Sequence, residues 1–180
     1  LYARLMNGEH RIDLDKEAEC YLNAWRFLGS AGFEHYEISN FAKPGHRSIH
    51  NWNTWRMHEW IGFGPSASSQ FRGWRRTQPH EFEAWESSQL REPVVMDEVG
   101  ITPELLATDT LIFGLRTNEG VDLAELSQRT PGVAIETWDS LWQHLANEGL
   151  MQREGRRIFL SEEGRLRADA IGAEILSRSP

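Results

Sequence analysis

A histidine followed by indole side chains is the first feature of this sequence that could do chemistry. His50 opens the segment His-Asn-Trp-Asn-Thr-Trp, in which Trp52 and Trp55 are the two indoles. A neutral imidazole is a common axial ligand of haem iron, and flat aromatic rings pack well against a macrocycle. A histidine that is hydrogen-bonded at the end of a strand explains the same residues. On chemistry alone, the segment favours that structural role.

Small residues form a second candidate site in the loop Gly62-Phe63-Gly64-Pro65, after a predicted strand. Glycine has no Cβ, so its backbone can approach a ligand closely. The loop is not a P-loop, because no Gly-Lys-Ser/Thr sequence follows it. It is not a dinucleotide-binding fingerprint either, because the third glycine is absent.

The carboxylate of Glu37 is a third candidate, within a predicted strand at residues 33–39. Alternation along the strand places Glu37 and Ser39 on one face, and Tyr36 and Ile38 on the other. In barrel folds the carboxyl ends of strands face the active site. Glu37 could therefore bind a cationic or hydroxyl group of a ligand. A paired or solvated carboxylate explains it equally well.

Composition limits the classes of protein and site that this sequence can form. The 180 residues carry a net charge of −8, which disfavours a broad nucleic-acid surface. The single cysteine, Cys20, excludes a disulfide framework, a cysteine-ligated zinc site and an iron–sulfur cluster held by this chain alone. No apolar run approaches the roughly 18 residues of a membrane span, and the first residues do not resemble a signal peptide. We therefore expect a cytoplasmic protein.

Helix and strand signals in the first half indicate an α/β fold. A helical pattern over residues 16–31 ends at Gly32, and the aromatic strand at 33–39 follows directly. A helix that leads into a buried strand in this way is a step of a wound or barrel fold. The further elements expected before residue 98 are strands at 49–55, 60–63 and 71–76 and a helix at 80–88.

The second half follows the order of a winged-helix module. Thr102 and Pro103 are typical of a helix start, with a capping side chain and proline at the first helical position. A change in composition between residues 90 and 100 divides the chain into 1–98 and 99–180. The later elements expected are helices at 121–128 and 134–147, a β-hairpin of strands 150–153 and 157–160, and a last helix that ends near 176.

DNA binding, the usual use of a winged helix, is disfavoured by charge. The helix at 134–147, which would enter the major groove, carries Glu136 and Asp139 and no lysine or arginine. Phosphate contacts supply most of the affinity in such complexes, and they require cations. We therefore expect a packing or protein-interaction module with no nucleic-acid partner. A DNA-binding regulator is kept as the alternative from a different class.

Several segments together resemble the HemW branch of the radical S-adenosylmethionine (SAM) proteins, long labelled as oxygen-independent coproporphyrinogen III oxidase-like. The family's YEISN(F/Y)A-PG stretch corresponds to residues 36–45, its HNxxYW stretch to 50–55 and its GxGPGA stretch to 62–67. Two residues depart from these patterns: Thr54 stands where the family has tyrosine, and Ser66 replaces a glycine. Later segments also resemble the family, at residues 115–122, 149–150 and 160–164.

The resemblance implies roles for particular residues, and it reverses the preference for a structural His50. The histidine of HNxxYW is associated with haem binding in the HemW branch, and the glycine loop would lie near the SAM pocket. No catalytic residue is assigned. The implied haem-binding residues are His50, Asn51 and Trp55, and the implied SAM- or substrate-pocket residues are Tyr36, Glu37, Asn40, Gly62, Gly64, Pro65 and Ala67.

The resemblance also implies a fold and a function. The family's CxxxCxxC motif, which holds a [4Fe–4S] cluster, is absent, and Cys20 cannot replace it. We therefore expect the C-terminal part of a longer protein: residues 1–98 would be the last strands and helices of a partial (β/α) barrel, and residues 99–180 a winged-helix-like domain. SAM and the cluster would serve only the full-length protein, and an unpaired sheet edge in half a barrel would favour oligomers.

The expected function is haem binding for delivery to respiratory haem proteins, with haem or another porphyrin as the partner. The alternative within the family is oxygen-independent coproporphyrinogen III oxidase, which forms protoporphyrinogen IX by oxidative decarboxylation. This chain alone, lacking the cluster ligands, is expected to have no radical chemistry.

Overall fold

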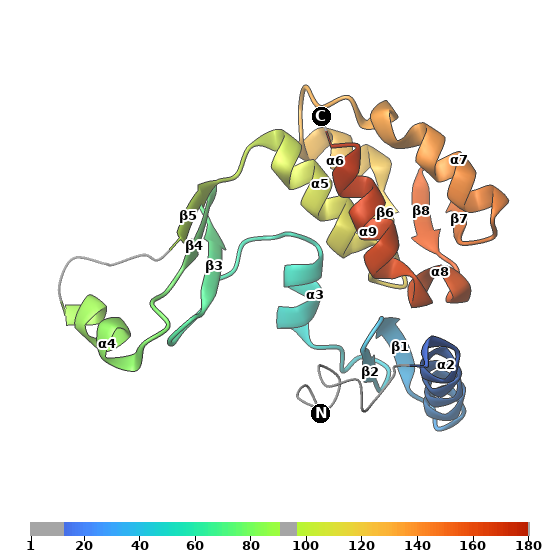
Figure 1. The fold of residues 1–180 in the computed structure, drawn as a ribbon, viewed down its shortest axis with the longest axis horizontal. Coiled ribbons are helices and arrows are strands. Elements are labelled where there is room, and N and C mark those ends of the chain that lie inside the picture. The colour runs from blue at the N-terminus through green and yellow to red at the C-terminus, as the bar shows by residue number, and fades with distance from the viewer. Residues whose placement is uncertain (1–12, 91–96, 180) are drawn as a thin grey trace. The chain divides into compact units, whose positions relative to one another are not determined.

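The computed structural model describes residues 13–90 and 97–179 (Figure 1). Contacts between residues divide the chain into two compact units, Leu1–Arg47 and Ser48–Pro180. Each unit is described separately below. Together the described residues form a mixed α/β structure in which every strand pairing is antiparallel. A (β/α) barrel needs parallel strands, and the described residues show no barrel.

The first unit is a helix followed by a short β-hairpin. Helix α2 (Leu14–Ser30) begins at Asp13, whose side chain accepts a hydrogen bond from the Lys16 backbone N–H. This confirms the helix predicted at 16–31. Strand β1 (Glu34–Glu37) confirms the core of the predicted strand, but β2 (Asn40–Ala42) then pairs with it antiparallel. Strand β2 was not expected from the sequence, and the chain reverses directly into it instead of crossing over through a helix.

The second unit begins with helix α3 (Ile49–Trp55), where the sequence predicted a strand. The Ser48 hydroxyl accepts a hydrogen bond from the Asn51 backbone N–H, and so caps the start of the helix. The Thr54 hydroxyl donates to the His50 and Asn51 carbonyl oxygens one turn earlier, a contact typical of threonine in a helix. The aromatic side chains had favoured a strand, but these local caps and the packing of α3 determine its structure.

A three-stranded antiparallel sheet follows, in the order β3-β4-β5. The predicted strand at 71–76 is in fact two strands, because Arg72 and Gly73 form the turn between β3 and β4 and both have positive φ. The predicted strand at 60–63 is reduced to a single bridge between Trp60 and Gln70. The elements of this part are β3 (Ser68–Phe71), β4 (Trp74–Thr77), α4 (Phe82–Leu90), which confirms the predicted helix, and β5 (Asp97–Gly100).

The remaining elements confirm most of the order predicted for the second half. Thr102 caps α5 by accepting from the Leu105 N–H, and Pro103 is its first residue. Strand β6, which was not predicted, adds to the hairpin to give a sheet ordered β6-β8-β7. The elements are α5 (Pro103–Gly114), β6 (Val121–Asp122), α6 (Leu123–Arg129), the 3₁₀ helix η1 (Ile135–Trp138), α7 (Asp139–Asn147), β7 (Met151–Glu154), β8 (Arg157–Leu160), α8 (Glu162–Leu166) and α9 (Ala168–Ser177).

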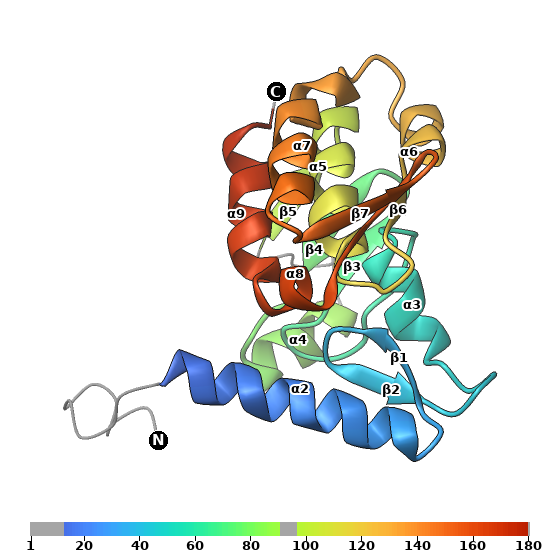
Figure 2. The same cartoon turned by 90° about the vertical axis from the view of Figure 1, so that its right-hand side faces the viewer.

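The core of the second unit lies between these helices and the sheet β6-β8-β7. Helices α5 and α9 pack against each other (Figure 1), and in the turned view α7 is drawn between them (Figure 2). Burial of the large apolar side chains removes them from water, which contributes roughly 1.5–3 kcal/mol for each. The residues with essentially no exposed surface are Ala107, Leu111, Leu126, Trp138, Leu141, Ile158 and Ile175.

Two buried tryptophans one turn apart differ in their hydrogen bonding. The indole N–H of Trp138 donates to the Ile175 carbonyl oxygen of α9 at 3.0 Å. The indole N–H of Trp142 is also buried, but it has no acceptor in the part of the chain that the structure describes. Trp138→Phe would therefore remove one of two donors to the Ile175 carbonyl oxygen, which would keep only the Arg178 backbone N–H at 3.2 Å, whereas Trp142→Phe would remove an unpaired donor.

We expect Trp138→Phe to lower the free energy of unfolding by about 0.5–1.5 kcal/mol more than Trp142→Phe does, because one hydrogen bond is lost. Both substitutions delete the same atoms, so each serves as the volume control for the other. Urea denaturation followed by circular dichroism measures the difference. Equal losses, or a larger loss for Trp142→Phe, would show that the Trp138–Ile175 hydrogen bond does not stabilise the core.

Candidate functional site

His50 lies in the first turn of α3 with its side chain exposed. No hydrogen bond or ion pair within residues 13–90 and 97–179 engages its imidazole ring, so both ring nitrogens are available to a ligand. The residue before it, Ile49, has 85% of its surface exposed. An accessible imidazole therefore lies beside an exposed apolar side chain.

The structure does not bring His50 and Trp55 onto one face of the helix. At 100° per residue, positions five apart point about 140° away from each other. The Trp55 ring instead packs against Phe113 of α5, with centroids 5.9 Å apart, and the Arg116 guanidinium lies 5.3 Å from its centroid. Asn51, half-buried, donates its backbone N–H to the helix cap. Of the three predicted haem-binding residues, only His50 is both exposed and unpartnered among the described residues.

Thr54 is the residue that shares the His50 face, because positions four apart lie above one another on a helix. Its hydroxyl donates to the His50 carbonyl oxygen at 3.2 Å and to the Asn51 carbonyl oxygen at 2.9 Å. This is the position at which the HNxxYW pattern has tyrosine. Its place beside His50 was missed, because a strand had been predicted there and the four-residue spacing was not considered.

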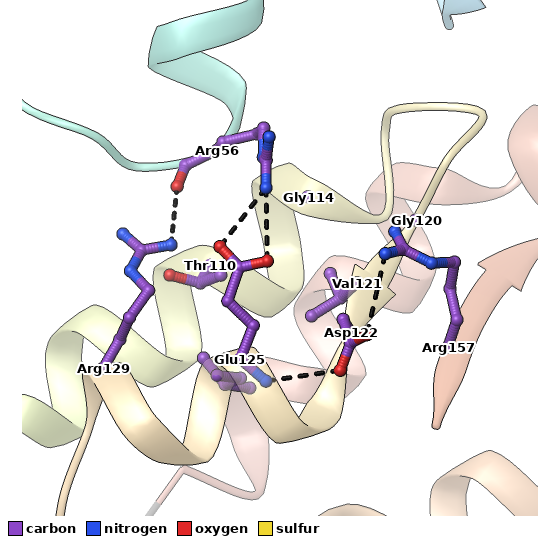
Figure 3. Close-up of a pocket in the computed structure, with 10 residues that line it drawn as sticks. Arg56, Thr110, Gly114, Gly120, Val121, Asp122, Glu125, Arg129 and Arg157 are labelled. Carbon is purple, nitrogen blue, oxygen red and sulfur yellow. Dashed lines mark hydrogen bonds and ion pairs between the residues drawn. The ribbon is translucent and has the colours of Figure 1, made fainter. Parts of the chain in front are cut away.

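The C-terminal end of α3 is held by two side chains of α6 (Figure 3). One guanidinium N–H of Arg129 donates to the Arg56 carbonyl oxygen at 3.0 Å, and another donates to the Met57 carbonyl oxygen at 2.7 Å. The Arg56 side chain in turn donates to both carboxylate oxygens of Glu125 at 3.2 Å. We call Arg56, Met57, Glu125 and Arg129 the α3 anchor.

Met57 ends α3 in a conformation that usually requires glycine. Its φ is 52°, its N–H donates to the Thr54 carbonyl oxygen, and the next N–H, of His58, donates to the Asn53 carbonyl oxygen. These are the two hydrogen bonds of a Schellman motif, in which the left-handed position is normally glycine. Only 6% of the surface of Met57 is exposed. Burial of this side chain gives a reason for methionine at a strained position.

The sheet β3-β4-β5 also reaches Met57. The Gln70 side chain donates to the Met57 carbonyl oxygen at 3.4 Å, and an N–H of Arg75 lies 3.9 Å from the Met57 sulfur. Arg75 forms an ion pair with Asp109 of α5 at 2.7 Å, and both side chains are largely buried. Met57 is therefore the point at which α3, the sheet and the helices α5 and α6 are connected.

A small cavity lies beside the α3 anchor, with a volume of about 30 Å³. Its lining includes the anchor residues Arg56, Glu125 and Arg129, together with Asp122 and the buried Thr110 (Figure 3). The Thr110 hydroxyl has no partner among the described residues. A cavity of this size holds about one water molecule. A porphyrin is too large to enter it.

The predicted glycine loop packs partly against its own chain. A Cβ at Gly62 would lie 2.4 Å from the Ser68 carbonyl oxygen, so the start of β3 already requires glycine there. Gly64 has φ 104° and open space around its Cα. Ser66, where the GxGPGA pattern has glycine, keeps the left-handed conformation with φ 61°. The loop is closed by a hydrogen bond from the Ala67 N–H to the Gly64 carbonyl oxygen at 3.2 Å, beside Pro65.

The predicted pocket residues of the first unit meet at the turn between β1 and β2. Glu37 is fully buried, and its two carboxylate oxygens accept from the Ser39 backbone N–H and the Asn40 side-chain amide. Tyr36 is also buried, and the Arg47 guanidinium lies 5.9 Å from its ring centroid. In this unit Glu37 therefore closes a turn through both of its oxygens.

A shallow surface groove runs between α6, η1 and the β7–β8 hairpin. Arg153 and Arg156 of the hairpin line it, but so do Glu136 and Asp139. A phosphate backbone in this groove would meet carboxylates as well as guanidinium groups. The mixed charge agrees with the low expectation of DNA binding.

The described residues contain neither a metal-binding cluster nor a membrane-spanning helix. Within residues 13–90 and 97–179, no three histidine, cysteine or acidic side chains come together in a group that could hold a metal ion. In the same residues, no helix is long and apolar enough to cross a membrane.

Comparison with known proteins finds relatives over most of the chain. The model of the HemN C-terminal domain matches residues 101–167. The chain is 30% identical to the mitochondrial radical S-adenosyl methionine domain-containing protein 1 of Bos taurus, over 92% of this chain and 40% of that protein. It is 33% identical to the heme chaperone HemW of Synechocystis, over 62% of this chain and 28% of that protein. The chain thus spans well under half the length of these relatives.

A solved structure has a similar fold. The structure described as coproporphyrinogen III oxidase (HemN) from Escherichia coli, a radical SAM enzyme, superposes with a TM-score of 0.65. It covers 86% of this chain and 39% of its own, at 16% sequence identity. At this level of identity, the likeness concerns the fold alone.

His58 directly follows Met57 of the α3 anchor, and the charged side chains of the anchor affect its pKa. Partial burial lowers the pKa of His58, the positive charges of Arg129 and Arg56 lower it further, and Glu125 acts in the opposite direction. A histidine whose folded pKa is lowered binds a proton more tightly when the chain is unfolded. The free energy of unfolding should therefore fall as the pH drops below about 6.5, the ordinary histidine value.

We expect an NMR titration of His58 to give a midpoint below 6.5. We also expect His58→Gln to reduce the loss of stability between about pH 7 and pH 5, because the titrating group is removed. A midpoint at or above the ordinary value would mean that Arg129 and Arg56 do not face this ring in solution.

Proposed function

We propose that this chain, which carries a HemN C-terminal domain at residues 101–167 and is related over most of its length to HemW proteins, binds haem through His50. The haem is cargo, to be delivered to respiratory haem proteins. The observation that carries the proposal is the exposed His50 imidazole on α3, which no described side chain engages. Relatives that bear the name heme chaperone HemW, two of them at 33% and 26% identity, support haem as the ligand.

The local chemistry fits a transient ligand better than a permanent one. Histidines that hold a metal permanently usually donate their second ring N–H to a fixed acceptor, which orients the ring and strengthens the bond. Within the described residues His50 has no such acceptor. The exposed imidazole would supply one iron ligand, and the apolar side chain of Ile49 beside it would supply some apolar contact. These two side chains do not form a pocket around a haem. Such a site suits a protein that must release its haem.

The architecture of the whole protein forms part of the same proposal. Residues 1–98 would correspond to the last part of a radical SAM barrel, and residues 99–180 to a winged-helix-like domain. The order α5, β6, α6, α7 and the β7–β8 hairpin supports the second assignment. Haem-bearing respiratory proteins as partners, self-association and a cytoplasmic location remain proposals of the same kind.

The cofactors of the relatives would not be held by this chain alone. A [4Fe–4S] cluster needs three cysteine ligands in this family, and the sequence has one, Cys20, which lies exposed on α2. A SAM pocket that includes Tyr36, Glu37, Asn40 and the loop Gly62–Ala67 is proposed for the longer protein. Glu37 is engaged within its own unit, whereas Gly64 leaves open space for a ligand.

A second candidate is oxygen-independent coproporphyrinogen III oxidase. The match of residues 101–167 to the HemN C-terminal domain favours it. Incubation of the cluster-loaded full-length protein with SAM, a reductant and coproporphyrinogen III separates the two functions. Formation of protoporphyrinogen IX would identify the oxidase and count against a haem carrier.

Haem titration of the 180-residue chain tests the role of His50. We expect the wild-type chain to give the absorption band of histidine-ligated haem and His50→Ala to lose it, because the axial ligand is gone. His46→Ala is the matched control, since His46 is also exposed and its ring already contacts the Pro44 carbonyl oxygen. Equal binding by all three chains, or no binding by any of them, would rule out His50 as the ligand.

A further inference from the structure

We propose that Arg129 is a positioning residue for the haem site: from α6 it fixes the end of α3 and thereby the orientation of His50. This inference rests on the proposed function, because it concerns the helix that carries the proposed ligand. Arg129 itself would not touch the haem. Four features of α3 and of the α3 anchor support this role.

The first feature is the pair of carbonyl groups that Arg129 binds. The last carbonyl oxygens of a helix have no partner within it and must find donors elsewhere. Arg129 donates to the Arg56 carbonyl at 3.0 Å and to the Met57 carbonyl at 2.7 Å. The planar guanidinium group can reach both acceptors at once because its N–H groups form a fixed fork. A lysine ammonium is a single point of charge and lacks that geometry.

The second feature is the spacing of Glu125 and Arg129 on α6. Residues four apart lie on the same face of a helix, so both side chains reach the same target. Glu125 accepts from the Arg56 side chain while Arg129 donates to the Arg56 backbone. One residue at the end of α3 is thus held through both its side chain and its main chain. Burial lowers the pKa of Arg129, and the negative charge of Glu125 opposes that shift.

The third feature is the length of α3. The helix has seven residues, well below the roughly 12–15 at which an isolated helix becomes even marginally stable in water. Its start is capped by Ser48, and no residue of α3 is fully buried. Its helical structure therefore depends strongly on contacts at its C-terminal end.

The fourth feature is the strained backbone of Met57. A non-glycine residue with positive φ persists only where its surroundings enforce it. The Met57 carbonyl, which lies directly after the strained torsion, receives the shorter of the two Arg129 hydrogen bonds. Without that donor the turn would relax, the last turn of α3 would open, and His50 would lose its fixed direction.

The experiment compares three variants of the 180-residue chain: Arg129→Met, Arg129→Lys and the control Arg153→Met. Arg153 is an exposed arginine of β7, and its side chain donates a hydrogen bond to the carbonyl oxygen of Gly155 in its own turn. Two quantities are measured. Amide hydrogen exchange reports on the Met57 and His58 N–H groups that close α3, and absorption titration gives the dissociation constant for haem.

We expect Arg129→Met to expose the Met57 and His58 amides to exchange and to weaken haem binding about tenfold, as loss of a group that orients a metal ligand typically does. Amides of α5 and α9 should keep their protection, which separates loss of positioning from unfolding. Arg129→Lys should change amide exchange and haem affinity less than Arg129→Met does. Arg153→Met should match the wild type in both quantities.

Three outcomes would overturn the inference. Unchanged exchange in both Arg129 variants would show that the anchor does not hold α3. Faster exchange with unchanged haem affinity would show that His50 does not depend on the anchor. If the wild-type chain itself binds no haem, the proposed function fails and the role of Arg129 fails with it. If Arg129→Met unfolds the chain, amide exchange and haem affinity are compared between the wild type and Arg129→Lys, and the first two outcomes are judged on that variant alone.

Discussion

Two carbonyl groups at the end of a seven-residue helix constrain much of the second unit. They need donors from outside α3, and Arg129 of α6 and Gln70 of β3 supply them. Because the Met57 carbonyl accepts from both, a strained turn becomes the junction of a helix, a sheet and the C-terminal domain. The hydrogen bonds at this junction fix the end of α3, and through the helix they orient the exposed His50 at its other end.

The C-terminal domain was largely predictable, because its signals are local. Thr102 and Pro103 mark the start of α5 by capping and by a fixed φ, and both act within one helical turn. Helix α7 ends at Asn147, as the predicted range 134–147 had it, and Gly149 follows with φ 71°. Ser161 caps α8 by accepting from the Gly164 N–H. Where each element is determined by its own residues, reading the sequence was sufficient.

The candidate site was only partly predictable, because its contacts are not local. His50 was selected as a candidate ligand because of the residues beside it in the sequence. Residues 49–55, however, were expected to form a strand. Seven residues are too few for hydrophobic periodicity to distinguish a helix from a strand. The anchor was missed altogether, since Arg56 and Glu125 are 69 positions apart and no pattern connects them. Glu37 is a different case: its partners Ser39 and Asn40 are only two and three residues away, but they reach its carboxylate because the chain turns there from β1 into β2, and that turn was not predicted.

The exposure of His50 has a kinetic consequence for any haem that it binds. A ligand on an exposed helix face arrives and leaves from the same side, so none of the segments that the structure describes contacts the His50 ring and has to open first. Release would then be governed by the strength of one iron–nitrogen bond, with no gating step. A recipient protein could approach the iron while it is still bound, and transfer could proceed by direct exchange between two histidines without free haem in solution.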